Sequence, residues 1–244
     1  MKINAKGVHY RELNQKIRQA VEAGETDIRL DAVNGQRYIG GGLKGQVHLA
    51  INGVPGNALA SFMDGPTIEV SNNAQDGVGN TMNAGKVVVN GDAGDILGYA
   101  MRGGKLFVRG NVGYRVGIHM KSYQDKQPVI VIGGGAGDFL GEYMAGGLIV
   151  VLCLDQKDGR SCVGNYIGTG MHAGTIYIRG EVQDYQVGKE VGIREPTDDD
   201  MAALEENLRE YCKDVGLSVK NLLKDRYTKL IPYSSRPYGK LYAY

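Results

Sequence analysis

Hydrophobic and polar positions divide the chain into a helical start, a long β region and a helical stretch near the C-terminus. Between residues 10 and 23 the apolar residues recur at helical spacing, and a glycine follows as a stop: Leu13, Ile17, Ala20, Val21 and then Gly24. From about residue 36 to 182, short β-branched runs alternate with Gly-rich turns, without a 3.6-residue period. The pattern predicts a helix over 10–23 and strands through the middle of the chain.

The C-terminal stretch begins with a helix signal. Thr197-Asp-Asp-Asp200 has the form of a capping box, and the apolar positions after it lie on one helix face up to Gly216: Met201, Leu204, Leu208, Tyr211 and Val215. A second short helix is expected around residues 218–226. Residues 227–244 are rich in tyrosine, with prolines at 232 and 237 that interrupt regular structure. A strand with alternating faces is expected near the start of the chain, over Ile28-Arg29-Leu30.

Six of the eight methionines form a regular series: Met63, Met82, Met101, Met120, Met144 and Met171. The first three gaps are 19 residues each, and the last two are 24 and 27 residues. An apolar residue and a glycine precede most of these methionines, and a pair of small residues and an apolar strand follow them. A unit of this length cannot bury its own apolar face, so it stacks on its neighbours. The middle of the chain is predicted to be a solenoid.

The strand composition favours a parallel β-helix over a leucine-rich repeat, because the Leu-x-x-Leu-x-Leu frame is missing. Each coil would advance by the strand spacing of about 4.8 Å, so six to seven coils form a rod of about 30 Å. We expect the methionines to stack inside the rod, because a thioether fills irregular space. Gly94, Gly113 and Gly137 are expected at corners with positive φ. The small residues after each methionine are expected to let successive backbones approach closely.

We expect one structural domain with three parts: a helix–strand cap over residues 1–35, β-helix repeats over 36–182, and a C-terminal helical segment and Tyr-rich tail over 183–244. The helices at both ends are expected to cover the unpaired strand edges of the solenoid. Two longer units carry insertions at 121–128 and 155–161, which are expected to form outside loops.

Composition excludes several classes of function. The chain has 244 residues with 28 basic and 27 acidic side chains, so its net charge of +1 gives no field to attract nucleic acid or an anionic membrane. No apolar run is long enough to span a membrane, and no N-terminal signal is visible, so a cytoplasmic protein is expected. The three cysteines, Cys153, Cys162 and Cys212, lack CxxC spacing, which predicts buried reduced thiols and no zinc site.

Residues 129–155 imitate a dinucleotide-binding unit. An apolar strand, Val129 to Ile132, runs into a Gly-rich turn, and a second strand ends at Asp155. The third glycine of the fingerprint is Asp138, however, and the Gly-Gly-Ala-Gly-Asp segment at 134–138 parallels Gly-Asp-Ala-Gly-Asp at 91–95. The repeat therefore explains the segment better than a nucleotide site does.

Asp76, Asp95 and Asp138 occupy equivalent corners of the repeat, and the first two belong to adjacent coils. Neighbouring carboxylates could bind Ca²⁺ or act as acid and base on a polysaccharide. Asp also favours turns because its side chain accepts hydrogen bonds from turn amides. The turn interpretation is favoured, since no basic or aromatic residue repeats beside these positions. Among the histidines His9, His48, His119 and His172, His119 precedes its methionine and His172 follows its own, so these two share no column and no metal site is expected.

Several sequence motifs of the repeat are distinctive in combination: Gly91-Asp-Ala-Gly-Asp95, Met101-Arg-Gly-Gly104, Arg115-Val-Gly-Ile-His-Met120, Phe139-Leu-Gly-Glu-Tyr-Met-Ala-Gly-Gly147 and Gly168-Thr-Gly-Met-His172. They resemble the C-terminal GXGXG domain of the large (alpha) subunit of glutamate synthase, here as a separate chain. The tail from Tyr227 to Pro232 and from Ser235 to Gly239 is similar as well, so the resemblance covers residues 3–244. A more distant likeness is to the β-helical subunit of formylmethanofuran dehydrogenase.

The resemblance implies a right-handed β-helix that braces two catalytic parts without a catalytic residue of its own. In glutamate synthase a glutaminase domain with an N-terminal cysteine nucleophile releases ammonia. A separate domain with FMN and an iron–sulfur cluster then makes glutamate from 2-oxoglutarate. This chain starts with Met1-Lys2 and has no clustered cysteines, so both parts would come from partner chains or be absent.

The sequence therefore predicts a non-catalytic scaffold subunit of a split glutamate synthase-type complex. The expected partners are a glutaminase-type amidotransferase subunit and an FMN/iron–sulfur synthase subunit, and a homo-oligomer is also compatible with the sequence. We expect no catalytic, cofactor-binding or metal-binding residue in this chain, with FMN, the iron–sulfur cluster and NADPH or ferredoxin bound by partners. The alternatives are a polysaccharide-active enzyme using Asp76 and Asp95, or a dinucleotide-binding protein at residues 129–155. A Tyr-rich tail could pack on this chain or on a partner.

Overall fold

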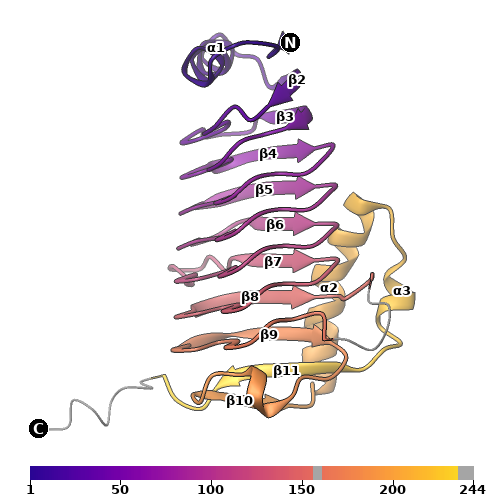
Figure 1. Cartoon of the computed structure of the whole chain (residues 1–244). Coiled ribbons are helices and arrows are strands. Elements are labelled where there is room, and N and C mark those ends of the chain that lie inside the picture. Colours follow the sequence, from indigo (N-terminus) through magenta and orange to yellow (C-terminus); the bar gives the residue numbers. More distant parts are fainter. Residues whose placement is uncertain (156–160, 236–244) are drawn as a thin grey trace, which may run out of the picture.

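The computed structural model describes residues 1–155 and 161–235 and shows a β-solenoid in which a single sheet runs the length of the rod (Figure 1). Eleven strands make the sheet, and the first nine follow one another in chain order. These nine are β1 Lys2–Asn4, β2 Asp27–Asn34, β3 His48–Val54, β4 Asp64–Val70, β5 Ala84–Val89, β6 Lys105–Val108, β7 Val129–Ile132, β8 Ala145–Val151 and β9 Ala173–Arg179. All neighbouring pairs among them are parallel, which confirms the predicted parallel β-helix.

The remaining elements lie at the two ends and on one side of the rod. Helix α1, Tyr10–Glu22, lies beside the first coil (Figure 1). After β9 come the short 3-10 helix η1 Asp184–Gln186, strand β10 Val191–Arg194, helix α2 Asp198–Val215, helix α3 Val219–Leu222 and strand β11 Tyr227–Pro232. The expected helices over 10–23 and after Thr197 are confirmed, and each ends before a left-handed glycine, Gly24 and Gly216.

Side chains stack in columns inside the rod. The sheet register aligns one aliphatic residue from each coil: Leu49, Ile68, Val87, Leu106, Ile130, Ile149 and Ile176. The six regularly spaced methionines form a second column, and each has a solvent exposure of 0%. This interior is one continuous apolar cluster, as expected for units that can only bury their apolar face against their neighbours.

The outer face of the sheet changes character along the rod. On β2, β3 and β4 its central outward residues are Arg29, Ala50 and Glu69, none of them buried. From β5 onward the outward residues are apolar and buried: Val88, Phe107, Val131, Val150 and Tyr177. Helix α2 covers this second half with its own apolar side (Figure 1), burying Leu204, Leu208 and Tyr211 in a second cluster. The sheet is therefore apolar on both faces only where a helix covers it.

Polar contacts fix α2 against the sheet. Lys86 of β5 donates to Glu210 at 3.2 Å and to Asp214 at 2.7 Å, and Lys105 of β6 also contacts Glu210. At the start of α2, the Asp200 side chain accepts from Lys229 at 2.6 Å. Burial would raise the pKa of the Asp200 carboxyl, but the hydrogen bonds from Lys229 and from its neighbours Thr197 and Tyr177 hold that pKa well below its usual range.

Strands close the C-terminal end of the rod. Strand β11 pairs antiparallel with β9 on one side and with β10 on the other, so the edge of the last coil is covered. We expected a C-terminal helix at this end, whereas the long helix α2 lies along the side of the rod. The first part of the Tyr-rich tail thus packs on its own chain, with Tyr227 buried. The later tyrosines Tyr238, Tyr242 and Tyr244 lie outside the described residues.

The corner glycines have a different cause from the one predicted. Gly94, Gly113 and Gly137 do not have positive φ. A Cβ at Gly94 would lie 2.0 Å from the Asp76 Oδ1, and a Cβ at Gly113 would lie 1.9 Å from the Asp95 Oδ1. Close approach between coils therefore requires glycine at these corners. Close approach of the backbones was also expected after the methionines and is present after Met101: a Cβ at Gly103 would lie 2.4 Å from the Asn83 carbonyl oxygen.

The prediction of reduced thiols is wrong for two of the three cysteines. Cys153 and Cys162 form a disulfide with their Cα atoms 5.6 Å apart. They stand at either end of the charged excursion 155–161, most of which lies outside the described residues. Adjacent coils lie about 4.8 Å apart, and this spacing suits a disulfide between neighbouring coils. Cys212 of α2 is free and buried, and burial raises the pKa of its thiol.

Candidate interaction surface

The side of each coil that leads to the methionine has an unusual backbone. Left-handed residues alternate with ordinary ones, at one, three and five residues before the methionine. In the coil of Met144 these are Phe139, Gly141 and Tyr143, with φ of 63°, 67° and 53°. Amide groups along this path bond alternately to the coil above and the coil below: the Phe139 amide donates to the Asn165 carbonyl, and the Gly141 amide to the Val116 carbonyl, both at 2.8 Å. We call this side of the rod the turn face.

Large side chains occupy the left-handed positions of the turn face although they gain little burial there. Phe62 is 58% exposed, Tyr166 is 54% exposed and Tyr38 is 48% exposed. All three have φ near +60°. A left-handed conformation costs a residue with a Cβ about 1–2 kcal/mol, which glycine would avoid. Strained residues whose side chains stay largely exposed mark a candidate functional surface.

Five aromatic side chains on the coils from Met101 to Met171 contact one another from coil to coil. The ring centroids of His119 and Tyr143 are 5.2 Å apart and stacked, and Tyr99 meets His119 edge to face at 5.9 Å. Phe139 stacks on Tyr166 at 4.9 Å. Such pairs hold the rings at fixed positions. The result is a rigid, exposed aromatic strip.

One charged pair is built into the same strip. The Arg115 guanidinium lies 4.5 Å from the centroid of the Phe139 ring and forms an ion pair with Glu142, whose side chain is nearly buried. Both charges are thus held in place next to the aromatic rings. Aromatic residues and arginine are the types enriched at protein interfaces.

The aspartates at the corners act as spacers between coils. The Asp76 Oδ1 accepts from the Asp95 amide at 2.9 Å, and the Asp95 Oδ1 accepts from the Tyr114 amide at 2.8 Å. The Asp138 Oδ1 accepts from the Asn165 amide at 2.7 Å. A parallel ladder uses Asn73, Asp92 and Asn111 for the same contact, so a neutral amide serves as well as a carboxylate. The turn interpretation explains these residues without an acid–base pair.

The structure contradicts the dinucleotide alternative at residues 129–155. A binding unit of that kind needs a helix directly after the first strand, with its N-terminus on the pyrophosphate. The described chain from Gly133 to Tyr143 instead forms turns and a bridge, and then enters β8 beside β7. The glycines are needed because of neighbouring backbone: a Cβ at Gly133 would lie 2.1 Å from the Arg109 carbonyl oxygen.

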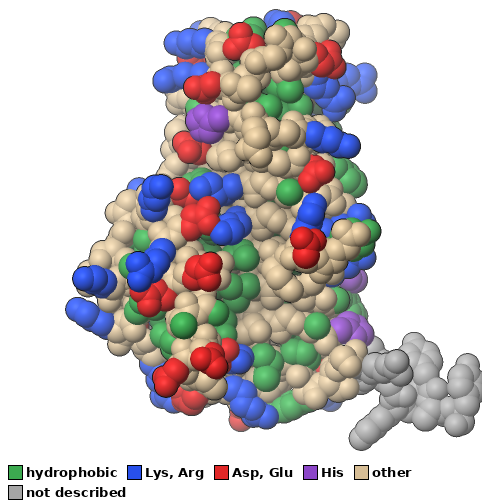
Figure 2. All heavy atoms as spheres, turned by 180° about the vertical axis from the view of Figure 1, so that it is seen from behind, with side chains coloured by type: hydrophobic (Ala, Val, Ile, Leu, Met, Phe, Trp, Pro, Cys, Tyr) green, Lys and Arg blue, Asp and Glu red, His purple; other side chains and the backbone are tan. Residues whose placement is uncertain are grey.

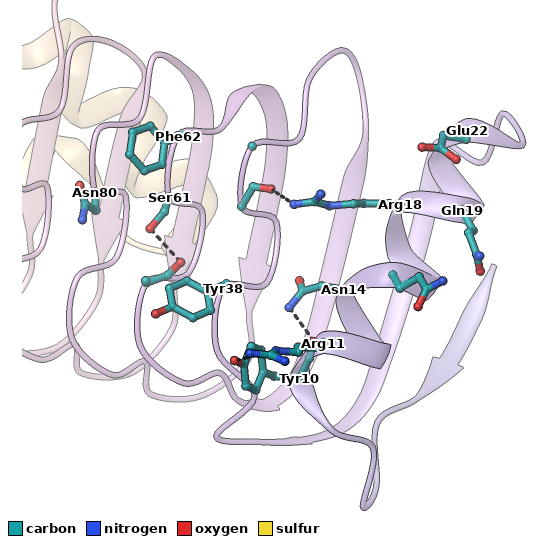
Figure 3. Close-up of a pocket in the computed structure, with 14 residues that line it drawn as sticks. Tyr10, Arg11, Asn14, Arg18, Gln19, Glu22, Tyr38, Ser61, Phe62 and Asn80 are labelled. Atoms are coloured by element: carbon teal, nitrogen blue, oxygen red, sulfur yellow. Dashed lines mark hydrogen bonds between the residues drawn. The ribbon is translucent and has the colours of Figure 1, made fainter.

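A groove of about 810 Å³ lies at the N-terminal end of the turn face, between α1 and the first coils (Figure 3). Its floor is the backbone of Gly41 and Gly42, where the next coil carries Ser61 and Phe62. Tyr38 and Phe62 line one side, and the polar side of α1 lines the other with Arg11, Asn14, Gln15, Arg18, Gln19 and Glu22. Asn14 donates to the Arg37 carbonyl at 2.9 Å and Arg18 to the Gly41 carbonyl at 3.2 Å, which joins α1 to the first coil.

Other kinds of site find no support in the described parts of the chain. No group of three or more His, Cys, Asp or Glu residues there could hold a metal ion. His48 lies between Asp27 at 3.2 Å and Glu69 at 3.5 Å on the polar half of the sheet. Within the described residues, no helix is both long and apolar enough to cross a bilayer. Charged side chains of both signs are mixed over the side that carries α2 and α3 (Figure 2), where they form ion pairs such as Lys86 with Asp214.

Sequence reasoning missed both the aromatic strip and the groove. The aromatic residues stand at different distances from their methionines: Phe139 five residues before, Tyr99 two before and Tyr143 one before. No single column of the repeat is therefore aromatic. A signal for the groove was present, since Gly40-Gly41-Gly42 stands where the next coil has Ala60-Ser61-Phe62.

The fold and the alternating left-handed positions, which have the spacing of Gly-x-Gly-x-Gly, define a class of β-helical domain. The chain belongs to the GXGXG motif family, whose pattern matches residues 11–234. It is 51% identical over 249 residues to an uncharacterized protein of Methanocaldococcus jannaschii, covering 98% of this chain and 95% of that one. A chain in the formyltransferase/hydrolase complex of Methylorubrum extorquens, solved with methylofuran, has a similar fold. Its TM-score is 0.62 at 21% identity, over 84% of this chain and 73% of that chain.

Proposed function

We propose that this chain is a non-catalytic scaffold subunit of a glutamate synthase-type complex. In this role it holds a glutaminase-type amidotransferase subunit and an FMN/iron–sulfur subunit in fixed positions. The amidotransferase releases ammonia from glutamine, and the flavin subunit uses the ammonia to convert 2-oxoglutarate into glutamate. FMN, the iron–sulfur cluster and the electron donor, NADPH or ferredoxin, bind to the partners.

The observation that carries this proposal is the aromatic strip. Tyr143 and Tyr166 of the strip keep strained backbone positions while their side chains stay exposed. The strip lies on a rod whose coils are joined by continuous backbone ladders, so its spacing is rigid. A rigid, exposed aromatic surface without converging acid–base groups suits binding to other chains better than catalysis. Membership of the GXGXG family and the resemblance of the repeat motifs to the glutamate synthase large subunit favour the glutamate synthase type.

A second candidate is the same scaffold role in a formyl-transferring complex. The fold match to a chain of the formyltransferase/hydrolase complex favours it. In both candidate functions this chain has no catalytic role, and the two differ in which partner chains it binds.

Native purification separates the two. An affinity-tagged chain is expressed in its source organism, purified at low salt, and the co-purifying chains are identified by mass spectrometry. We expect an amidotransferase chain and a flavin–iron–sulfur chain, and a complex that forms glutamate from glutamine and 2-oxoglutarate when a reductant is added. Recovery of formyltransferase chains would support the second candidate, and a chain that elutes alone as a monomer would contradict both.

A further inference from the structure

The groove at the N-terminal end of the turn face exists because the first coil has glycines where the next coil has side chains. At Gly42 a Cβ would meet nothing within 4 Å. The equivalent position carries Phe62 in the next coil and His119 and Tyr143 further along, all at a φ similar to the 68° of Gly42. A side chain is therefore sterically possible at residue 42. Its absence leaves open a groove of about 810 Å³, within the range of protein binding pockets.

The charge around the groove is predominantly positive. Arg11 and Arg18 line it from α1, and Arg37 lies over the ring of Tyr10 at 5.3 Å. Among the described residues, none of these three arginines has a carboxylate within ion-pair distance, whereas Glu22 is the acidic residue of the lining. Elsewhere on the rod, Arg115 and Arg226 are paired with glutamates, while Arg102 and Arg109 form no ion pair with a described residue. The groove thus combines an unmatched positive rim with an aromatic wall.

The lining also indicates what kind of ligand fits. Phe62 and Tyr38 offer apolar surface at the wall, while Gln15, Gln19 and Asn80 offer amides that can bond to a peptide backbone. The groove is open to solvent between α1 and the coils that carry Tyr38 and Phe62 (Figure 3). This shape and chemistry suit an extended chain with acidic side chains near the arginines and an apolar side chain against Phe62.

We propose that the groove binds an acidic, extended segment of a partner subunit, which places an apolar side chain against Phe62 and Tyr38. This inference rests on the proposed role as a subunit of a complex. It assigns the N-terminal end of the rod to one partner and leaves the aromatic strip for further contacts.

Two substitutions test the groove, and two others serve as controls. Gly42→Phe fills it with the side chain that the next coil carries at the equivalent position, and Arg11→Glu reverses its charge. Both are expected to lower partner recovery in the native purification at least about ten-fold. Gly42→Ala adds one methyl group at the same backbone conformation, and Lys16→Glu reverses a charge on α1 outside the groove lining. These two controls are expected to keep recovery within about two-fold of the unmodified chain.

The identity of the bound segment is tested with a photo-crosslinking residue, p-benzoylphenylalanine, at Gln19. The expected product joins α1 to a partner peptide that contains Asp or Glu beside an apolar residue. A crosslink to a second copy of this chain, to a basic or neutral peptide, or to no peptide while partners co-purify, would overturn the inference. Circular dichroism melting of Gly42→Phe shows whether the rod is folded; if it is not, the Arg11→Glu and crosslinking results decide.

The outcomes separate this inference from the proposed function. If the unmodified chain recovers its partners and Gly42→Phe and Arg11→Glu recover them equally well, the groove inference fails and the scaffold role stands. If the unmodified chain recovers no partner, the scaffold role fails and the inference fails with it.

Discussion

At the scale of single residues, glycine has two separate roles in this rod. On the turn face it relieves a left-handed backbone, as at Gly98 with φ of 70°. At the corners it allows a neighbouring side chain or backbone to approach, as at Gly113 against Asp95. Side chains replace glycine at other left-handed positions, so the left-handed backbone alone does not require it. Contact with the next coil decides where it is indispensable.

Alanine substitutions at Gly42 and Gly98, which have similar φ, separate the cost of contact with the next coil from the cost of the left-handed backbone. A Cβ at Gly98 would lie 2.5 Å from the Ile130 Cδ1, whereas a Cβ at Gly42 meets nothing within 4 Å. Gly42→Ala is expected to lower the free energy of unfolding by about 1 kcal/mol, the cost of the left-handed strain. Gly98→Ala adds overpacking of the interior and is expected to cost about 1–3 kcal/mol more. Denaturant titration of both variants checks this, and equal losses would contradict it.

The residue scale also shows what the sequence could and could not reveal. The interior column followed from the spacing of Met63 to Met171, because a fixed repeat places equivalent residues over one another. The cause of the corner glycines did not follow, since Gly94 and Gly113 are constrained by side chains of the preceding coil. A contact of that kind depends on atoms that are distant in the sequence and becomes visible only when the coils are stacked.

At the scale of elements, α2 was predicted with its boundaries but without its place. Its cap, its apolar face and its glycine stop are all local signals. Its position on the sheet depends on the outward residues of five strands, among them Val88, Phe107 and Tyr177. The signal was the change from a polar outward residue in β4, Glu69, to apolar ones from β5 onward. Strands that are apolar on both faces require a cover.

The start of α2 carries a titratable contact that is expected to be important for stability. Asp200→Asn removes the charge that pairs with Lys229 and weakens the hydrogen bonds from Thr197 and Tyr177. A loss of about 2–3 kcal/mol at pH 7 is expected, typical of hydrogen bonds to a charged group. Asp199→Asn, at the neighbouring exposed position, is the matched control and is expected to change stability by less than about 1 kcal/mol.

The pH dependence of this contact has a defined sign. The pKa of Asp200 is lowered in the folded chain. The carboxylate therefore contributes its full stabilisation above the unfolded pKa of about 4, and the contribution is lost as the pH falls toward the folded pKa. The difference in stability between the unmodified chain and Asp200→Asn is expected to shrink below about pH 4. A difference that stays constant from pH 7 to pH 3 would contradict this assignment.

At the scale of the whole molecule, the disulfide joins the last two long coils. Cys153 and Cys162 are 9 positions apart, so the bond closes a short loop. The chain-entropy relation gives about 2–3 kcal/mol for a loop of this size. Reduction is expected to lower the melting temperature by about 5–10 °C. Cys153→Ser should melt at the lower temperature with or without reductant, and three reactive thiols in the unreduced, unfolded chain would contradict the bond.

The molecular scale is also where prediction from sequence was least complete. The rod followed from the repeat, but the closing of its C-terminal end by β11 and β10 did not. Pro232 indicated irregular structure in a segment that forms a strand between β9 and β10. The strand tolerates this proline because Pro232 is the last residue of β11. The groove depends in turn on α1 and the first coils together, and neither element indicates it alone.

Because successive methionines from Met63 to Met120 are 19 residues apart, the number of such units sets the length of the rod. Each such unit adds one step of about 4.8 Å along the rod. Duplication or deletion of a whole unit would change the distance between the two ends and keep the stacking of the coils, while α2 would meet a shifted set of strands. A lineage of such proteins could therefore adjust the separation of what is attached at either end in equal increments, without redesigning the attachment points themselves.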